Sequence, residues 1–162
     1  MSMLAPMIDA YLAGPPTLRA AVADMHRDQL LARPVQGKWS TLEVVCHLAD
    51  FDTILADRMK RVIAEERPSL VGADETCFAR ALAYQQRDVQ EELSLIDLSR
   101  RQLGRILRTL TDDDLTRVGV HNERGPRTLE QLLKGATDHI HNHLKHIHEK
   151  RQALGLPPVH AA

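Results

Sequence analysis

Four long stretches of the chain repeat apolar residues at the spacing of an amphipathic helix, and proline and glycine stand between them. A further stretch, residues 117–126, alternates apolar and polar positions like a strand, but its two glycines and Pro126 favour a turn or small ribbon over a sheet. The chain is therefore predicted to be all-α, with a short extended segment before the last main helix. The expected helices cover residues 15–26, 40–66, 78–110 and 128–154, with a further short helix over residues 5–12.

Two of these helices begin with a capping box. Ser40 is followed three residues later by Glu43, and Thr128 is followed by Gln131. In this motif the hydroxyl accepts a hydrogen bond from the third helical amide, and the Glu or Gln side chain reaches back to the amide of the cap residue. The second and fourth main helices therefore begin at known residues, which fixes the face on which each of their side chains lies.

The connection between the second and third main helices is long. Residues 67–77 could span about 35 Å when fully extended, enough to cross much of a bundle from end to end. This length permits the two helices to run parallel but does not require it.

Composition and charge narrow the class of protein. The 162 residues suit one domain over residues 1–162, and the 3% aromatic content suits helices better than sheets. With 21 basic against 22 acidic residues and a net charge of -1, neither nucleic acid nor an anionic membrane is an expected partner. The N-terminus does not resemble a signal peptide, no apolar stretch approaches the ~20 residues of a membrane span, and two cysteines are too few for a disulfide framework. We expect a cytoplasmic protein.

Nine histidines are many for so few aromatic residues, and five of them lie between residues 139 and 148. At about 100° per residue from Leu129, His143 lies inside the apolar sector of its helix and His139 on the shoulder of that sector. The two are also four residues apart, one above the other on the helix, so their imidazoles can converge on one ion.

The second main helix offers a partner for this pair. His47 lies at the edge of its apolar face, with Asp50 next to it and expected to orient its ring. If the bundle brings that edge against His139 and His143, three neutral imidazoles would form an open site for a divalent ion such as zinc. The alternative is that these histidines are structural residues at the margin of the core. Other polar groups are expected to be solvated or inert: His26, His121, His148 and His160, an arginine stripe at 100, 101, 105 and 108, and a buried Cys46 thiol.

Two blocks of sequence resemble the DinB-like superfamily, which includes the mycothiol-dependent maleylpyruvate isomerases. The first is residues 37–50 (GKWSTLEVVCHLAD) and the second is residues 138–147 (DHIHNHLKHI). The resemblance implies a four-helix bundle of up-down-down-up topology and a divalent metal, zinc or nickel, bound by His47, His139 and His143. It also implies a homodimer, and a metal that serves either hydrolysis or the transfer of a low-molecular-weight thiol.

Two functions remain open on this basis. In the first, the chain is a metal-dependent enzyme that activates water or a thiol for reaction with a small-molecule substrate, and its general base is sought among a few side chains. In the second, the chain is a non-enzymatic metal-binding or oligomerising bundle. A catalytic ion keeps an open position facing a pocket, whereas a structural ion is closed off by its ligands. The candidate bases are Tyr84, Gln85, Arg87, Glu91 and His146.

Overall fold

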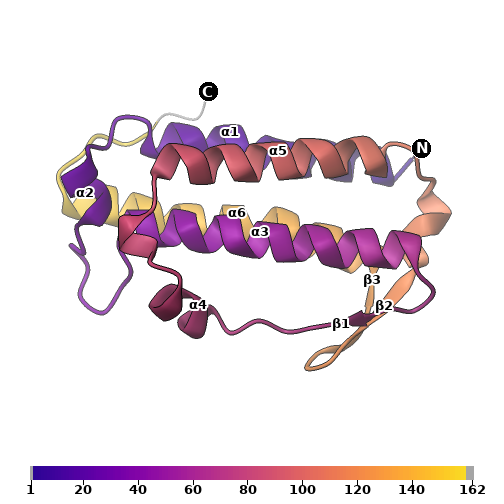
Figure 1. Ribbon diagram of the computed structural model, residues 1–162. Coiled ribbons are helices and arrows are strands. Elements are labelled where there is room, and N and C mark those ends of the chain that lie inside the picture. Colours follow the sequence, from indigo (N-terminus) through magenta and orange to yellow (C-terminus); the bar gives the residue numbers. More distant parts are fainter. Residues whose placement is uncertain (1, 160–162) are drawn as a thin grey trace.

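The computed structural model describes residues 2–159, and its core is a bundle of four long helices (Figure 1). Each of these helices packs against two neighbours, so that α1 and α3 face each other diagonally, as do α5 and α6. No helix within residues 2–159 combines the length and apolar character that a membrane span needs. The long helices are α1 (Leu4–Val22), α3 (Thr41–Ala64), α5 (Val89–Leu107) and α6 (Leu129–Ala153).

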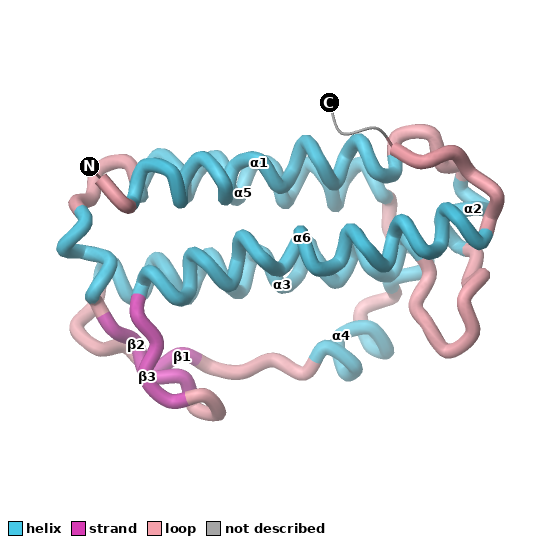
Figure 2. The backbone as a smooth tube through the Cα atoms, turned by 180° about the vertical axis from the view of Figure 1, so that it is seen from behind, coloured by secondary structure: helices cyan, strands magenta, loops and turns pink. Residues whose placement is uncertain are grey.

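The topology is up-down-down-up, as predicted, because α3 and α5 run in the same direction (Figure 1). The connection between them returns along the outside of α3 through β1 (Ser69–Leu70), α4 (Glu75–Ala81) and a short 3-10 turn, η1 (Tyr84–Gln86). Figure 2 shows α4 and the strands on the same side of the bundle, toward opposite ends. Two further short helices connect the long ones, α2 (Arg27–Leu31) and η2 (Asp112–Thr116).

The extended segment before α6 is a hairpin with one added strand. Strand β2 (Val118–His121) pairs antiparallel with β3 (Gly125–Thr128), as the predicted ribbon does. The two-residue β1 joins β2 in parallel, with Leu70 opposite His121. Gly119 permits this packing, because a Cβ there would lie 2.7 Å from the side chain of Leu70. The long connection is therefore held against the hairpin by strand pairing.

Both capping boxes are formed, and the helices they begin agree with the prediction to within two residues. The Ser40 hydroxyl accepts from the Glu43 amide at 3.1 Å, and the Glu43 carboxylate accepts from the Ser40 amide at 2.6 Å. The equivalent bonds between Thr128 and Gln131 are 3.1 and 3.2 Å. The register predicted for His47 and for the α6 histidines therefore holds.

The prediction of a helix break before residue 15 is wrong, because α1 continues through Pro15 and Pro16. Pro15 has no amide hydrogen to donate to the carbonyl of Tyr11, four residues earlier. The Arg100 guanidinium supplies that bond instead, with Nη1 2.8 Å from the Tyr11 oxygen. Gly14 leaves space for the arginine, since a Cβ at this position would lie 2.7 Å from Nη1.

The single helix predicted over residues 78–110 is also wrong, because the chain forms α4, η1 and α5 there. Ala83 adopts the left-handed conformation (φ 51°), which ends α4. Asp74 and Asp88 then act as N-caps, each accepting hydrogen bonds from two backbone amides. Asp88 followed by Glu91 resembles a helix start, and that signal was available in the sequence.

The prediction that Arg100 belongs to a solvated stripe is wrong. Arg100 is fully buried between two apolar clusters. It forms an ion pair with Asp52 of α3 and donates to the carbonyls of Tyr11 in α1 and Ala136 in α6. One guanidinium on α5 therefore connects all four long helices at the middle of the bundle.

Candidate metal centre

Three histidines from two helices meet on the side of the bundle that faces α4. His47 comes from α3, and His139 and His143 come from successive turns of α6. One nitrogen of each ring lies within 4.8 Å of the other two, and the Nε2 atoms of His47 and His139 are 3.0 Å apart. Two nitrogens bound tetrahedrally to one zinc ion lie about 3.3 Å apart, given Zn–N bonds of about 2.0–2.1 Å. The arrangement is therefore close to what one ion requires.

The three imidazoles are neutral, which is the form that binds metal. Burial is the main cause of a lowered pKa in each ring, and the neighbouring histidines add to it: His47 and His139 fall to about 3 and His143 to about 4. The Nδ1 atom of each ring is buried without a hydrogen-bond partner among the described residues. Three neutral imidazoles whose ring nitrogens converge within 4.8 Å fit a divalent cation better than a structural core.

Aromatic side chains hold the His47 ring in place. The ring of Phe51 lies 4.5 Å from the His47 ring, centroid to centroid, and that of Trp39 lies 5.3 Å away on the loop before α3. His47 itself is only 1% exposed, whereas His139 and His143 are half-buried. The triad is therefore packed on the α3 side and open on the α6 side.

A cavity of about 490 Å³ adjoins the open side of the triad. Its walls come from α3, α6, the connection before α4 and the hairpin, and all three histidines line it. Glu75, the first residue of α4, is exposed here, and its Oε2 lies 3.9 Å from Nε2 of His47. The prediction of a helix beginning at residue 78 placed Glu75 in a loop, which is why sequence reasoning missed it.

The predicted role of Asp50 is wrong. Its carboxylate accepts two hydrogen bonds of 2.9 Å from Arg87, which also pairs with Glu92, so Asp50 does not hold the His47 ring. Arg87 lies in this ion-pair network and not in the cavity. The other predicted bases, Tyr84, Gln85 and Glu91, do not line the cavity either.

Among the remaining histidines, His146 lines a shallow depression on the other side of Glu75 and packs 5.9 Å from the His143 ring. His26 and His148 are exposed, as predicted, whereas His121 is buried at 5% exposure, contrary to the prediction. Its burial follows from the pairing of β1 with β2, which the sequence pattern did not predict. His160 lies outside the described residues.

The Cys46 thiol is buried, as predicted, and is expected to be unreactive in the folded protein. Burial raises its pKa to about 12, and its Sγ lies 3.5 Å from the Tyr84 carbonyl oxygen. Because the thiolate is the nucleophile, a disulfide reagent at neutral pH should modify Cys77, which is exposed, and spare Cys46. Titration should give one fast thiol in native protein and two in denaturant. Two fast thiols, or a fast thiol that persists in Cys77→Ser, would contradict this.

Known proteins that are similar to this chain share its fold and are named as metal-dependent hydrolases. Residues 10–147 match the family model of the DinB superfamily. The chain is 31% identical over 142 residues to "putative metal-dependent hydrolase YfiT" of Bacillus subtilis, covering 87% of this chain and 80% of that one. A "putative metal-dependent hydrolase" of Oceanobacillus iheyensis is 30% identical over 133 residues, covering 82% and 77%.

The solved structure of YfiT has the same architecture. It is described as "a probable metal-dependent hydrolase with an unusual four-helix bundle topology". It matches with a TM-score of 0.89 at 29% identity, over 97% of this chain and 91% of that one. The likeness therefore covers the bundle, the long connection and the hairpin together.

Proposed function

Because the chain belongs to the DinB superfamily, we propose that it is a metal-dependent hydrolase whose divalent ion, zinc or nickel, is bound by His47, His139 and His143. The observation that carries the proposal is the cavity on the open side of the triad. Three protein ligands would leave a coordination position for water or substrate, and the cavity that the three histidines line is large enough for a small substrate. A purely structural ion would have no need of this opening, so the cavity favours the enzyme over the non-enzymatic bundle.

The bound ion would polarise the substrate carbonyl and the attacking water, which is the chemistry of metal-assisted hydrolysis. The protein residues would hold the histidine ligands in place and accept the proton of the attacking water. Phe51 and Trp39 hold the His47 ring against rotation, as their packing distances indicate. Glu75 is the carboxylate nearest the triad, and we assign it the role of general base that takes the proton from the attacking water.

A low-molecular-weight thiol could take the place of water in the same reaction. The cavity of about 490 Å³ beside the three histidines has room for a thiol and a second substrate. The same histidines and the same carboxylate would then serve, with Glu75 accepting the thiol proton. Turnover only with an added thiol would identify a transferase, and turnover in its absence would identify a hydrolase.

The Glu75→Gln substitution should separate catalysis from metal binding. Glutamine keeps the shape of the side chain but cannot accept the proton, so kcat should fall by about 10²- to 10⁴-fold while the metal content stays at the wild-type level. A panel of chromogenic esters and amides, with and without added thiol, gives the rates, and elemental analysis gives the metal.

Glu91→Gln on α5 is the matched control, because Glu91 is exposed and lies outside the cavity. It should leave both rate and metal content unchanged. If Glu75→Gln loses metal in proportion to activity, Glu75 is a ligand and not the base. If wild-type protein loaded with metal shows no turnover on any member of the panel, the enzyme proposal is wrong.

A further inference from the structure

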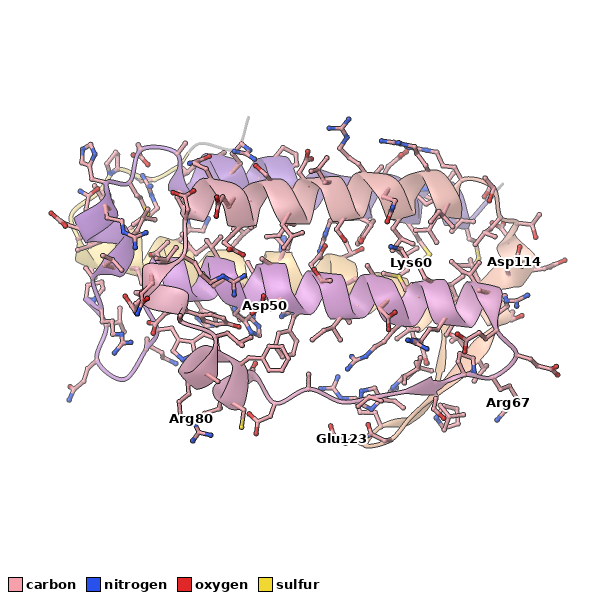
Figure 3. All side chains as sticks on the ribbon, viewed as in Figure 1. Asp50, Lys60, Arg67, Arg80, Asp114 and Glu123 are labelled. Atoms are coloured by element: carbon pink, nitrogen blue, oxygen red, sulfur yellow. The ribbon has the colours of Figure 1, made fainter. Side chains whose placement is uncertain are left out.

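The cavity beside the triad extends to a second cluster of polar side chains at the hairpin end of the bundle. Arg58 lies eleven residues beyond His47 on α3, which is about 16 Å along the helix axis. His121 ends β2, and Arg124 lies in the turn between β2 and β3, where Figure 3 shows the neighbouring Glu123. All of them line the same cavity as the triad.

The His121 ring has a defined tautomer. Its Nδ1 lies 3.2 Å from the backbone amide of Glu123 and 3.3 Å from that of Arg124, so Nδ1 acts as the acceptor. The proton of the neutral ring is therefore on Nε2. Burial and then the positive charges of Arg58 and Arg124 lower the pKa of His121, which keeps the ring neutral. His121 thus contributes a hydrogen-bond donor that is held in position by the hairpin turn.

The two guanidinium groups lack a carboxylate partner within residues 2–159. Neither Arg58 nor Arg124 makes an ion pair there, although Arg58 donates one bond to the carbonyl of Val71. The Nε atom of Arg58 is buried and has no hydrogen-bond partner among these residues. Since the Val71 carbonyl accepts from Nη2 alone, other guanidinium donors of Arg58 are left for an anion in the cavity.

Glu123, which lines the same cavity, can offset only one of the two guanidinium charges. It is exposed, and its carboxylate lies over Gly72, where an added Cβ would be 2.6 Å from Oε1. Burial and then the positive charge of Arg124 lower the pKa of Arg58, while the carboxylates of Glu123 and Asp57 raise it. The remaining acids of the cavity are placed elsewhere, with Glu75 at the triad and Asp138 bound to Lys134 at 2.6 Å. The hairpin end of the cavity is therefore positive.

We propose that Arg58, His121 and Arg124 bind an oxyanion of the substrate, a carboxylate or a phosphate, while the bond to be broken lies at the histidine triad. The inference rests on the proposed function, which it narrows to small anionic substrates. A guanidinium provides paired donors that match the oxygens of either group, and a neutral imidazole adds one more. The separation along α3 requires several bonds between the anionic group and the reacting carbonyl.

Anion binding to the metal-free protein tests the proposal apart from the metal. Acetate and inorganic phosphate are titrated separately by calorimetry, with the ¹H–¹⁵N signals of the His121 ring followed in parallel. At least one anion should bind saturably and shift those signals. Arg124→Gln should weaken that binding about tenfold, equivalent to about 1.4 kcal/mol. Binding of acetate alone would identify a carboxylate subsite, and binding of phosphate alone a phosphate subsite.

Arg105→Gln is the matched control, since Arg105 is exposed on α5 and does not line the cavity. It should leave anion affinity unchanged, and Arg124→Gln should keep the wild-type metal content. If neither anion binds, or if Arg124→Gln binds both as wild type does, the subsite proposal is wrong. A wild-type protein that binds the anion but no metal would instead refute the proposed function and leave the subsite standing.

Discussion

His143→Ala is expected to weaken the affinity of the protein for zinc and nickel by at least about 100-fold, because it removes one of three imidazole ligands. His143 is the best position for this change. It is half-buried at the cavity, so alanine there should disturb packing less than at His47, which is 1% exposed. The measurement is titration of metal into chelator-treated protein, with elemental analysis of protein purified without an affinity tag that binds metal.

His148→Ala is the control on the same helix, since His148 is exposed and lies outside the cavity. It should retain the full wild-type metal content. If His143→Ala binds metal as well as wild type does, the histidine triad is not the metal site. Loss of metal together with a large fall in melting temperature would indicate a structural ion, whereas loss of metal with an unchanged melting temperature agrees with a catalytic one.

Arg100→Met is expected to destabilise the fold by about 3–5 kcal/mol, because it leaves the Asp52 carboxylate buried without its partner. The carbonyl of Tyr11, which Pro15 cannot satisfy, also loses its donor. For a chain of this size the melting temperature should fall by about 10 °C or more. Denaturant unfolding of wild type and variant gives the difference in the free energy of unfolding, provided that this free energy depends on denaturant concentration with the same slope in both.

Arg101→Met provides the comparison, because Arg101 is exposed and pairs with Asp97 at 3.4 Å on the same helix. Its effect should stay within about 0.5 kcal/mol. The double variant Asp52→Leu, Arg100→Met should recover part of the lost stability, since no unpaired charge then remains in the core. If Arg100→Met is as stable as Arg101→Met, the buried guanidinium does not hold the four helices together.

The sequence predicted the triad because its three residues lie in helices with well-marked starts. The capping boxes at Ser40 and Thr128 set the register, and that register placed His47, His139 and His143 at the edges of apolar faces. Their convergence also needed the two helices to be neighbours, which spacing alone could not establish. The family resemblance supplied that step, and the packing of α3 against α6 agrees with it.

Other features could not be predicted because they depend on tertiary contacts. The prolines of α1 suggested a break, although buried positions at helical spacing continue through them, from Tyr11 to Pro15 to Leu18. The compensating donor, Arg100, lies 89 residues away from Tyr11. Glu75 and His121 belong to the cavity only because the long connection folds back and pairs with the hairpin. No local pattern contains that information.

The connection that makes α3 and α5 parallel adds a wall to the cavity from residues that are not buried in the helical core. None of the α4 residues is buried, yet Glu75 and the adjoining Gly72 and Ala73 form a wall of the cavity. Substitutions at Gly72, Ala73 and Glu75 can change which substrate fits without removing a side chain from the core. Related proteins with this topology should therefore differ in the substrates that fit partly through residues 72–75, while the bundle stays the same.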